Sequence, residues 1–144
     1  MPNVKNYNQL FKQLQKVISE SLKDEVADEA IKTMKFEIKR QVYDAYEPLS
    51  YERKYDDGGL VDDANILTEV NGTTLVVENI RRDENDISRN VAYVVETGEG
   101  YQYNVPERLK YGRPFTMATR EELKNGKAVN ALKKGLNNRG LKTE

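Results

Sequence analysis

Apolar residues recur every three or four positions along the first third of the chain, which is the spacing of one helix face. The positions between them are mostly Gln, Lys and Glu, which favour helix formation, and Pro48 stops the helix. The pattern predicts helix over residues 7–46. The stripe slips by one residue near Asp24, a residue type that caps helix starts, so the segment is either one bent helix or two in series. The stripe consists of Leu10, Leu14, Val17, Ile18, Leu22, Ala27, Ala30, Ile31, Met34, Ile38, Val42 and Ala45.

Residues 66–80 carry two β-branched runs on either side of Asn71-Gly72, which is the pattern of a β-hairpin. Asn-Gly favours a type I′ turn, in which both central residues take positive φ angles. Because side chains alternate across a strand, we expect one face of the hairpin to point to the core. That face consists of Ile66, Thr68, Val70, Leu75 and Val77.

The segments after the hairpin are less regular. Residues 81–90 are charged and have no aromatic residue, so we expect a mobile loop or one that only a partner shapes. Residues 90–96 fit either a third strand or a short buried helix, because short apolar runs do not separate the two. Residues 101–112 fit a loop or a second, irregular hairpin.

A helical pattern returns over residues 116–139. Thr116 or Thr119 is expected to cap it, and Thr119 has Glu122 three residues on, as in a capping box. Gly126 is expected to break the helix into two pieces and Gly140 to end it.

The order of these elements predicts an α+β fold in one domain that spans residues 1–144. A long N-terminal helix, one or two in series, packs on a small and mostly antiparallel sheet, and a C-terminal helix completes the fold. The long helix is expected to turn its apolar stripe to the core, although such a stripe also lines subunit interfaces.

The segment from Tyr43 to Ile66 combines tyrosines, charged residues and a Gly58-Gly59 step, and no single helix or strand fits it. Tyrosine and arginine are enriched where proteins bind other proteins. An acidic group also lies here, but its spacing is not that of a calcium loop and is typical of turns. The group consists of Asp56, Asp57, Asp62 and Asp63. We therefore expect this segment to serve assembly.

The composition argues against several classes of function. The 144 residues include no cysteine and no histidine, which removes disulfides, thiolate metal ligands and the usual side chain for proton transfer near neutral pH. No carboxylate pair stands out as an acid–base couple. We expect no enzymatic activity, no cofactor and no metal. No apolar run approaches the roughly 20 residues of a membrane span, and no signal-peptide pattern is present, so we expect a soluble intracellular protein without a membrane partner.

The net charge of −1 hides an uneven distribution. Residues 44–107 hold five Lys and Arg against fifteen Asp and Glu, whereas residues 108–143 hold ten against two. Opposed patches would let identical copies join head to tail in a ring. The alternative is a small nucleic-acid-binding module that uses the basic C-terminal helix, although no aromatic residue lies among these cations to stack on bases. The cations are Lys124, Lys127, Lys133, Lys134, Arg139 and Lys142.

Five stretches taken in order resemble the neck and tail-completion proteins of long-tailed bacteriophages of Gram-positive hosts. They are V-Y-D-A-Y-E-P (42–48), Y-E-R-K-Y-D-D-G-G-L-V-D-D-A-N-I (51–66), A-Y-V-V-E-T-G (92–98), R-P-F (113–115) and L-K-K-G-L-N-N-R-G-L (132–141). The order and spacing of the stretches carry the resemblance, which spans most of the chain. The tyrosine-rich stretch 101–111 is longer than the resemblance leads us to expect.

The resemblance implies a structural virion protein that joins head and tail. Such a protein forms a ring, a hexamer or a dodecamer, assembles in the host cytoplasm, resides in the neck of the virion and has no cofactor. Its partners would be its own copies, neighbouring neck and tail-tube proteins and the DNA that passes through the ring. The interface residues that the resemblance implies are Tyr51, Arg53, Tyr55, Gly58, Gly59, Leu60, Arg113, Pro114 and Phe115. The alternative for the loop is local scaffolding, with its tyrosines packed on their own subunit and Arg53 paired to a carboxylate.

Overall fold

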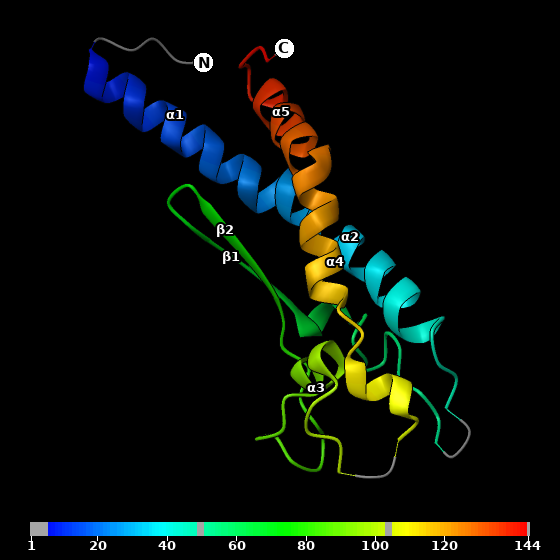
Figure 1. Ribbon diagram of the computed structural model, residues 1–144. Helices are drawn as coiled ribbons and strands as arrows, with labels where there is room; N and C mark the ends of the chain where they lie inside the picture. The colour runs from blue at the N-terminus through cyan, green and yellow to red at the C-terminus, as the bar shows by residue number, and fades with distance from the viewer. Residues whose placement is uncertain (1–5, 49–50, 103–104, 144) are drawn as a thin grey trace.

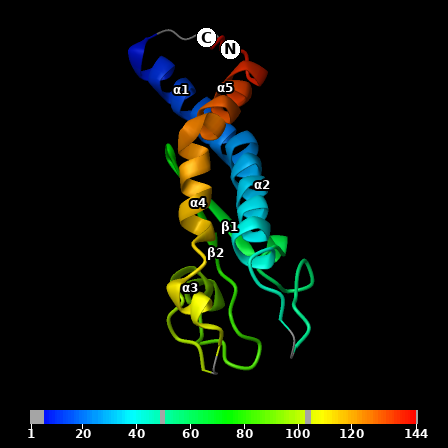
Figure 2. The same cartoon turned by 45° about the vertical axis from the view of Figure 1, so that its right-hand side comes forward.

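A computed structural model of the chain describes residues 6–48, 51–102 and 105–143. Two long helical rods cross each other, and a β-hairpin runs along the first rod (Figure 1). The first rod contains α1 (Tyr7–Ser21) and α2 (Ala27–Ile38), and the second contains α4 (Phe115–Glu122) and α5 (Ala128–Asn138). α1 begins and α5 ends at the same end of the molecule, where the two helices diverge (Figure 2). This arrangement confirms the α+β class.

The first rod is one continuous helix. A π-helical turn, Leu22–Val26, joins α1 to α2, and the N–H of Ala27 donates to the carbonyl of Leu22 five residues earlier. A π turn holds one more residue than an α turn, which is the reason that the apolar stripe slips near Asp24. Asp24 therefore does not cap a second helix. A second π turn, Lys39–Tyr43, ends the rod three residues before the predicted boundary.

The hairpin pairs β1 (Ile66–Asn71) with β2 (Thr74–Asn79) in antiparallel register. Asn71 lies opposite Thr74, so the turn residues are Gly72 and Thr73 and not Asn71 and Gly72. Gly72 has φ +64°, and no residue other than glycine has a positive φ in the described chain. This is the φ pattern of a type II′ turn, so the type I′ prediction is wrong.

The predicted face of the hairpin does point inward. Ile66 is buried, and the other members of that face are half-buried. On the opposite face Leu67 and Val76 are exposed.

The irregular middle of the chain takes a definite shape. Residues 90–96 contribute to a helix, α3 (Val91–Thr97), because the side chain of Asn90 caps it by accepting the N–H of Tyr93 at 3.0 Å. The segment before α3 is shaped by its own contacts and not by a partner alone. Arg82 pairs with Asn90 as an isolated bridge, and Arg89 Nη1 lies 3.3 Å from a carboxylate oxygen of Asp83.

The stretch 101–112 forms no second hairpin in its described residues. Its ordered element is a 3₁₀ turn, Glu107–Tyr111. The N–H of Arg113, just after this turn, donates to the carbonyl of Val95 at 2.8 Å, which ties the end of the stretch to α3.

The start of the second rod differs from the prediction. α4 begins at Phe115, and Thr119 lies inside it, where its hydroxyl donates to the carbonyl of Phe115 at 2.7 Å. The cap comes from α3, since the Glu96 carboxylate accepts the N–H groups of Thr116 at 2.8 Å and Met117 at 3.1 Å. Neither threonine is therefore the cap. Gly126, with φ +119°, does break the rod as predicted.

The core lies at one end of the molecule, where α2, the base of the hairpin, α3 and the start of α4 meet. Phe115 is fully buried there, so α4 starts within the core. α1 and α5 extend away from this end (Figure 1). The core residues are Met34, Ile38, Val42, Leu60, Ile66, Ala92, Val95 and Phe115.

Candidate functional site

The tyrosine-rich segment folds back onto the end of the first rod. Arg53 donates from Nη1 to the carbonyl of Tyr43 at 2.9 Å and from Nη2 to the carbonyl of Tyr46, and its guanidinium lies 5.0 Å from the Tyr43 ring centre. The last carbonyls of a helix lack partners within the helix, and a cation is favourable there. Arg53 is therefore a cap for the rod, and no carboxylate among the described residues pairs with it. The Tyr55 ring meets the Tyr43 ring edge-on at 4.7 Å, as the scaffolding alternative expected.

The Gly58-Gly59 step is a close turn of the backbone. A Cβ on Gly59 would lie 2.3 Å from the carbonyl oxygens of Lys54 and Tyr55, and Gly58 has φ +104°. Asp62 holds the turn by accepting the N–H of Gly58 at 2.8 Å. This acidic residue thus has the turn role that its sequence context indicates.

The predicted interface residues divide into a buried, a partly buried and an exposed set. Leu60 and Phe115 are in the core and Gly59 is buried, so none of these three presents a surface to another chain. Gly58 and the two arginines are partly buried. The exposed members are Tyr51, Tyr55 and Pro114.

Four of the predicted residues meet around one pocket of about 270 Å³. They are Tyr51, Arg53, Leu60 and Arg113. Arg113 donates from Nη2 to the hydroxyl of Tyr101 at 2.8 Å and from Nη1 towards the carbonyl of Val42 at 3.5 Å. The structure therefore joins the tyrosine-rich segment to the R-P-F stretch, which the sequence separates by about 50 residues.

Arg81 also lines this pocket and was not predicted. Burial raises the pKa of the neighbouring Tyr43 hydroxyl, and the charges of Arg81 and Arg53 act in the opposite direction. Lys54 and Glu84, both lining residues, form an ion pair. No local motif marks Arg81, because only the packing of the charged segment on α3 brings it to the pocket.

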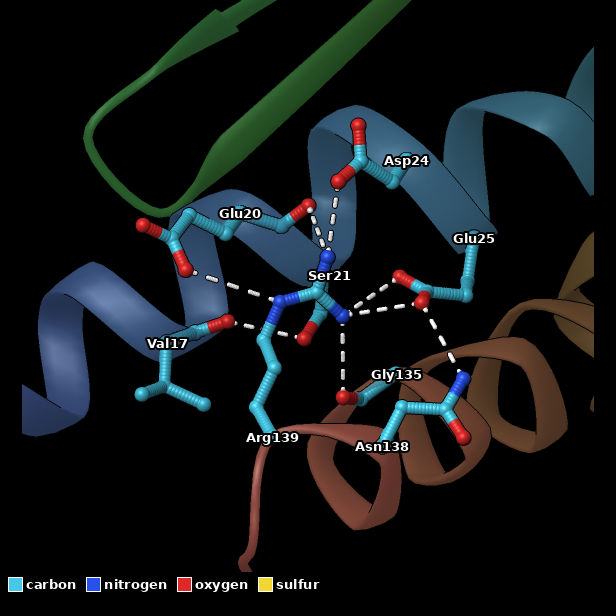
Figure 3. A network of polar contacts seen from close by, with 8 residues as sticks. All are labelled: Val17, Glu20, Ser21, Asp24, Glu25, Gly135, Asn138 and Arg139. Carbon is cyan, nitrogen blue, oxygen red and sulfur yellow. Dashed lines mark hydrogen bonds and ion pairs between the residues drawn. The ribbon is translucent and has the colours of Figure 1, made fainter. Parts of the chain in front are cut away.

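A second feature is the crossing of the two rods. Figure 3 shows the guanidinium of Arg139 among the carboxylates of Glu20, Asp24 and Glu25. Burial acts to raise the pKa of Glu25, but hydrogen bonds from Arg139, its own main-chain N–H and Asn138 hold the pKa below its ordinary value. The same hydrogen bond with Glu25 raises the pKa of Arg139.

The rods approach closely at this crossing because Gly135 has no side chain. A Cβ there would lie 2.7 Å from the Cβ of Ser21, which is fully buried. Arg139 Nη1 also donates to the carbonyl of Gly135 at 2.9 Å. The stretch L-K-K-G-L-N-N-R-G-L thus forms the crossing.

Some cations of the basic C-terminal helix form ion pairs within the chain. Arg139 is held by carboxylates of the first rod, and Lys127 lies 3.4 Å from a carboxylate oxygen of Glu122. The cations of this helix therefore do not all face a nucleic acid.

Beyond the crossing, α1 exposes two aromatic side chains. Tyr7 is 86% exposed and Phe11 is 58% exposed. They are four residues apart and therefore lie on the same side of the helix. Neither residue belongs to the apolar stripe that the sequence predicts for this helix.

Two other kinds of site are absent from the described ranges 6–48, 51–102 and 105–143. No group of three or more carboxylates is arranged to hold a metal ion there. No helix in those ranges is long and apolar enough to cross a bilayer.

The chain belongs to the YomN family, whose sequence profile matches residues 6–138. The SPbeta prophage-derived uncharacterized protein YomN of Bacillus subtilis (strain 168) is 44% identical over 119 residues, which cover 79% of this chain and 78% of that relative. No solved structure matches the chain significantly. The similarity indicates that this protein is of phage origin, in agreement with the phage part of the sequence resemblance.

Proposed function

We propose that this protein is a structural component of a tailed bacteriophage particle. The protein completes the tail and joins it to the head. It forms a ring at the neck with its own copies, a hexamer or a dodecamer, and contacts neighbouring neck and tail-tube proteins and the DNA within the ring. It assembles in the host cytoplasm and stays in the virion. It has no enzymatic activity, no cofactor and no membrane partner. Its family, with a prophage-derived relative, supports a phage role.

The observation that carries the proposal is the aromatic pair Tyr7 and Phe11 on α1. Both side chains are exposed on a helix that extends away from the core. Large exposed apolar side chains that lie together mark surfaces that bind other proteins. Burial of one such ring against a partner contributes about 1.5–3 kcal/mol.

The crossing of the rods supports the same role, because it holds α1 in one direction. Gly135 lies against Ser21 and Arg139 binds Glu25, so the aromatic pair is presented by a fixed support. A surface that is ordered before binding loses little conformational entropy when the partner arrives.

The charge distribution supports contacts between identical copies. The acidic segment 44–107 forms the hairpin, α3 and the loops at the core end of the molecule, whereas α5, which carries Lys133 and Lys134, extends to the other end (Figure 1). A head-to-tail contact between these regions repeats from copy to copy and closes a ring when the rotation allows.

Deletion of the gene from the phage or prophage that carries it tests the proposal. After induction, electron microscopy should find filled heads and separate tails, and a wild-type copy supplied in trans should restore joined particles. Joined, infectious particles in normal number without the protein would rule the proposal out.

A further inference from the structure

The pocket of about 270 Å³ beside the core is surrounded by cations from three segments of the chain. Arg53 and Lys54 come from the tyrosine-rich segment, Arg81 follows the hairpin, and Arg113 precedes α4. Three separate segments thus bring positive charge to one place. Positive charges held close together repel one another unless an anion lies between them.

The carboxylates that line the pocket balance this charge only in part. They are Glu52, Asp83 and Glu84. Glu84 pairs with Lys54, and Asp83 lies 3.3 Å from Arg89, which is not a lining residue. Glu52 is therefore the one remaining carboxylate in the described lining to balance the charges of the three lining arginines.

The arginines are unequally engaged by the protein. Arg53 donates to main-chain carbonyls at the end of the first rod, and Arg113 donates to Tyr101 and Val42. The Nε atoms of Arg81 and Arg113 are buried, and neither has an acceptor among the described residues. A buried donor without an acceptor costs about 1–3 kcal/mol. Of the three arginines, Arg81 has the fewest contacts with acceptors of the described chain.

The rest of the pocket lining is apolar and aromatic. Val42, Leu60 and Val95 belong to the core, and Tyr43 and Tyr51 add aromatic rings. A ligand that matches this lining carries an anionic group next to an apolar body. The volume accommodates one or two amino-acid side chains and lies just below the roughly 300–1,000 Å³ of typical small-molecule sites.

We infer that this pocket binds a carboxylate of a neighbouring polypeptide, with an apolar side chain beside that carboxylate seated against the core residues. A guanidinium meets the two oxygens of a carboxylate in one plane, and Arg81 is the donor that the protein leaves open for it. Phosphate carries no apolar part and would leave the valine and leucine side chains without a contact. The inference rests on the proposed function only in taking the polypeptide to be another protein of the phage particle.

The test titrates the isotope-labelled full chain with N-acetyl-leucine, which has a free carboxylate beside an apolar side chain. Two controls are N-acetyl-leucinamide, which lacks the charge, and inorganic phosphate, which lacks the apolar body. N-acetyl-leucine should shift the backbone amide signals of residues that line the pocket, with saturation at millimolar concentration, and the two controls should not.

Arg81→Gln should weaken this binding at least tenfold, which corresponds to about 1.4 kcal/mol. Arg81→Gln removes a buried Nε donor that has no acceptor among the described residues, so the variant should unfold at a temperature no lower than that of the wild type. Arg82→Gln is the matched control, because it removes the same charge at the next position in the chain. The Arg82 side chain is exposed and does not line the pocket. It should bind N-acetyl-leucine like the wild type.

Three results would overturn the inference: no shifts at the pocket with N-acetyl-leucine, equal binding of the amide or of phosphate, or equal loss in the two glutamine variants. Each readout is a binding measurement on purified protein. A phage that joins heads to tails without this protein would refute the proposed function and leave the binding result unchanged.

Discussion

Arg139 Nη1 lies 2.8 Å from both carboxylate oxygens of Glu25, which is 114 residues earlier in the chain. Only 19% of the arginine side chain and 18% of the glutamate side chain are exposed. Because both groups are largely shielded from water, solvent screens their attraction less than it screens a surface pair. This contact ties α5 to the π turn Leu22–Val26 and thereby sets the direction of α1.

Replacement of Arg139 by Ala should lower the free energy of unfolding by about 2–3 kcal/mol, because Glu25 would keep its charge without its main partner. Urea denaturation measures the change. Lys32→Ala is the control, since it removes an ion pair with Asp28 that is exposed on the first rod. That pair should contribute less than about 0.5 kcal/mol. Equal losses in the two variants would contradict a special role for Arg139.

Acid should weaken the protein through Glu25. Its pKa in the folded chain lies below the ordinary value of 4.5, so the folded state binds the proton less tightly than the unfolded state does. The stability from this group is therefore fully present above pH 4.5 and is lost as the pH falls through the lower, folded pKa. We expect the free energy of unfolding to fall in that range in the wild type and to fall less steeply in Glu25→Gln. If the free energy of unfolding falls with pH equally steeply in the two proteins, Glu25 is not the group responsible.

Gly135→Ala should destabilise the crossing by about 1–3 kcal/mol, because the new methyl group would overlap Ser21. The double variant Ser21→Gly with Gly135→Ala removes the atoms that the methyl group meets. It should be more stable than the sum of the two single changes indicates, which a double-mutant cycle of unfolding free energies measures. Strict additivity would mean that the two residues are not in contact.

Glu96→Gln should cost about 1–2 kcal/mol, because the carboxylate that accepts two N–H groups at the start of α4 loses its charge. Glu121→Gln, at an exposed position near the end of the same helix, removes the same charge without touching this cap. Its effect on thermal unfolding should stay within about 0.5 kcal/mol. A larger loss in the control would show that net charge, and not the cap, governs stability.

Replacement of Tyr7 and Phe11 together by Ser should leave the unfolding temperature nearly unchanged, because both side chains are exposed. It should reduce self-association, which light scattering of the concentrated protein measures, and the number of joined phage particles. Lys12→Ser changes an exposed residue on the same helix and should leave both unaltered. Normal self-association and normal particle numbers in the double variant would show that this surface takes no part in the proposed assembly.

The amino-acid sequence by itself determined the local elements. The steps of three and four in the apolar stripe correctly indicated the first rod, and the β-branched runs around Gly72 indicated the hairpin and its inward face. Gly126 likewise indicated the break in the second rod. These features depend on side-chain periodicity and on the backbone freedom of glycine, which are properties of neighbouring residues.

Only the tertiary structure decided the features that join distant segments. The cap of α4 is Glu96 of α3, the crossing pairs Arg139 with Glu25, and the pocket includes Arg81 from a segment without a motif. Each of these depends on which surfaces of the helices pack together, and a charged side chain has the same local pattern whether it faces water or a buried partner. The sequence therefore contains all of these residues but does not distinguish them from the many other charged residues of the chain.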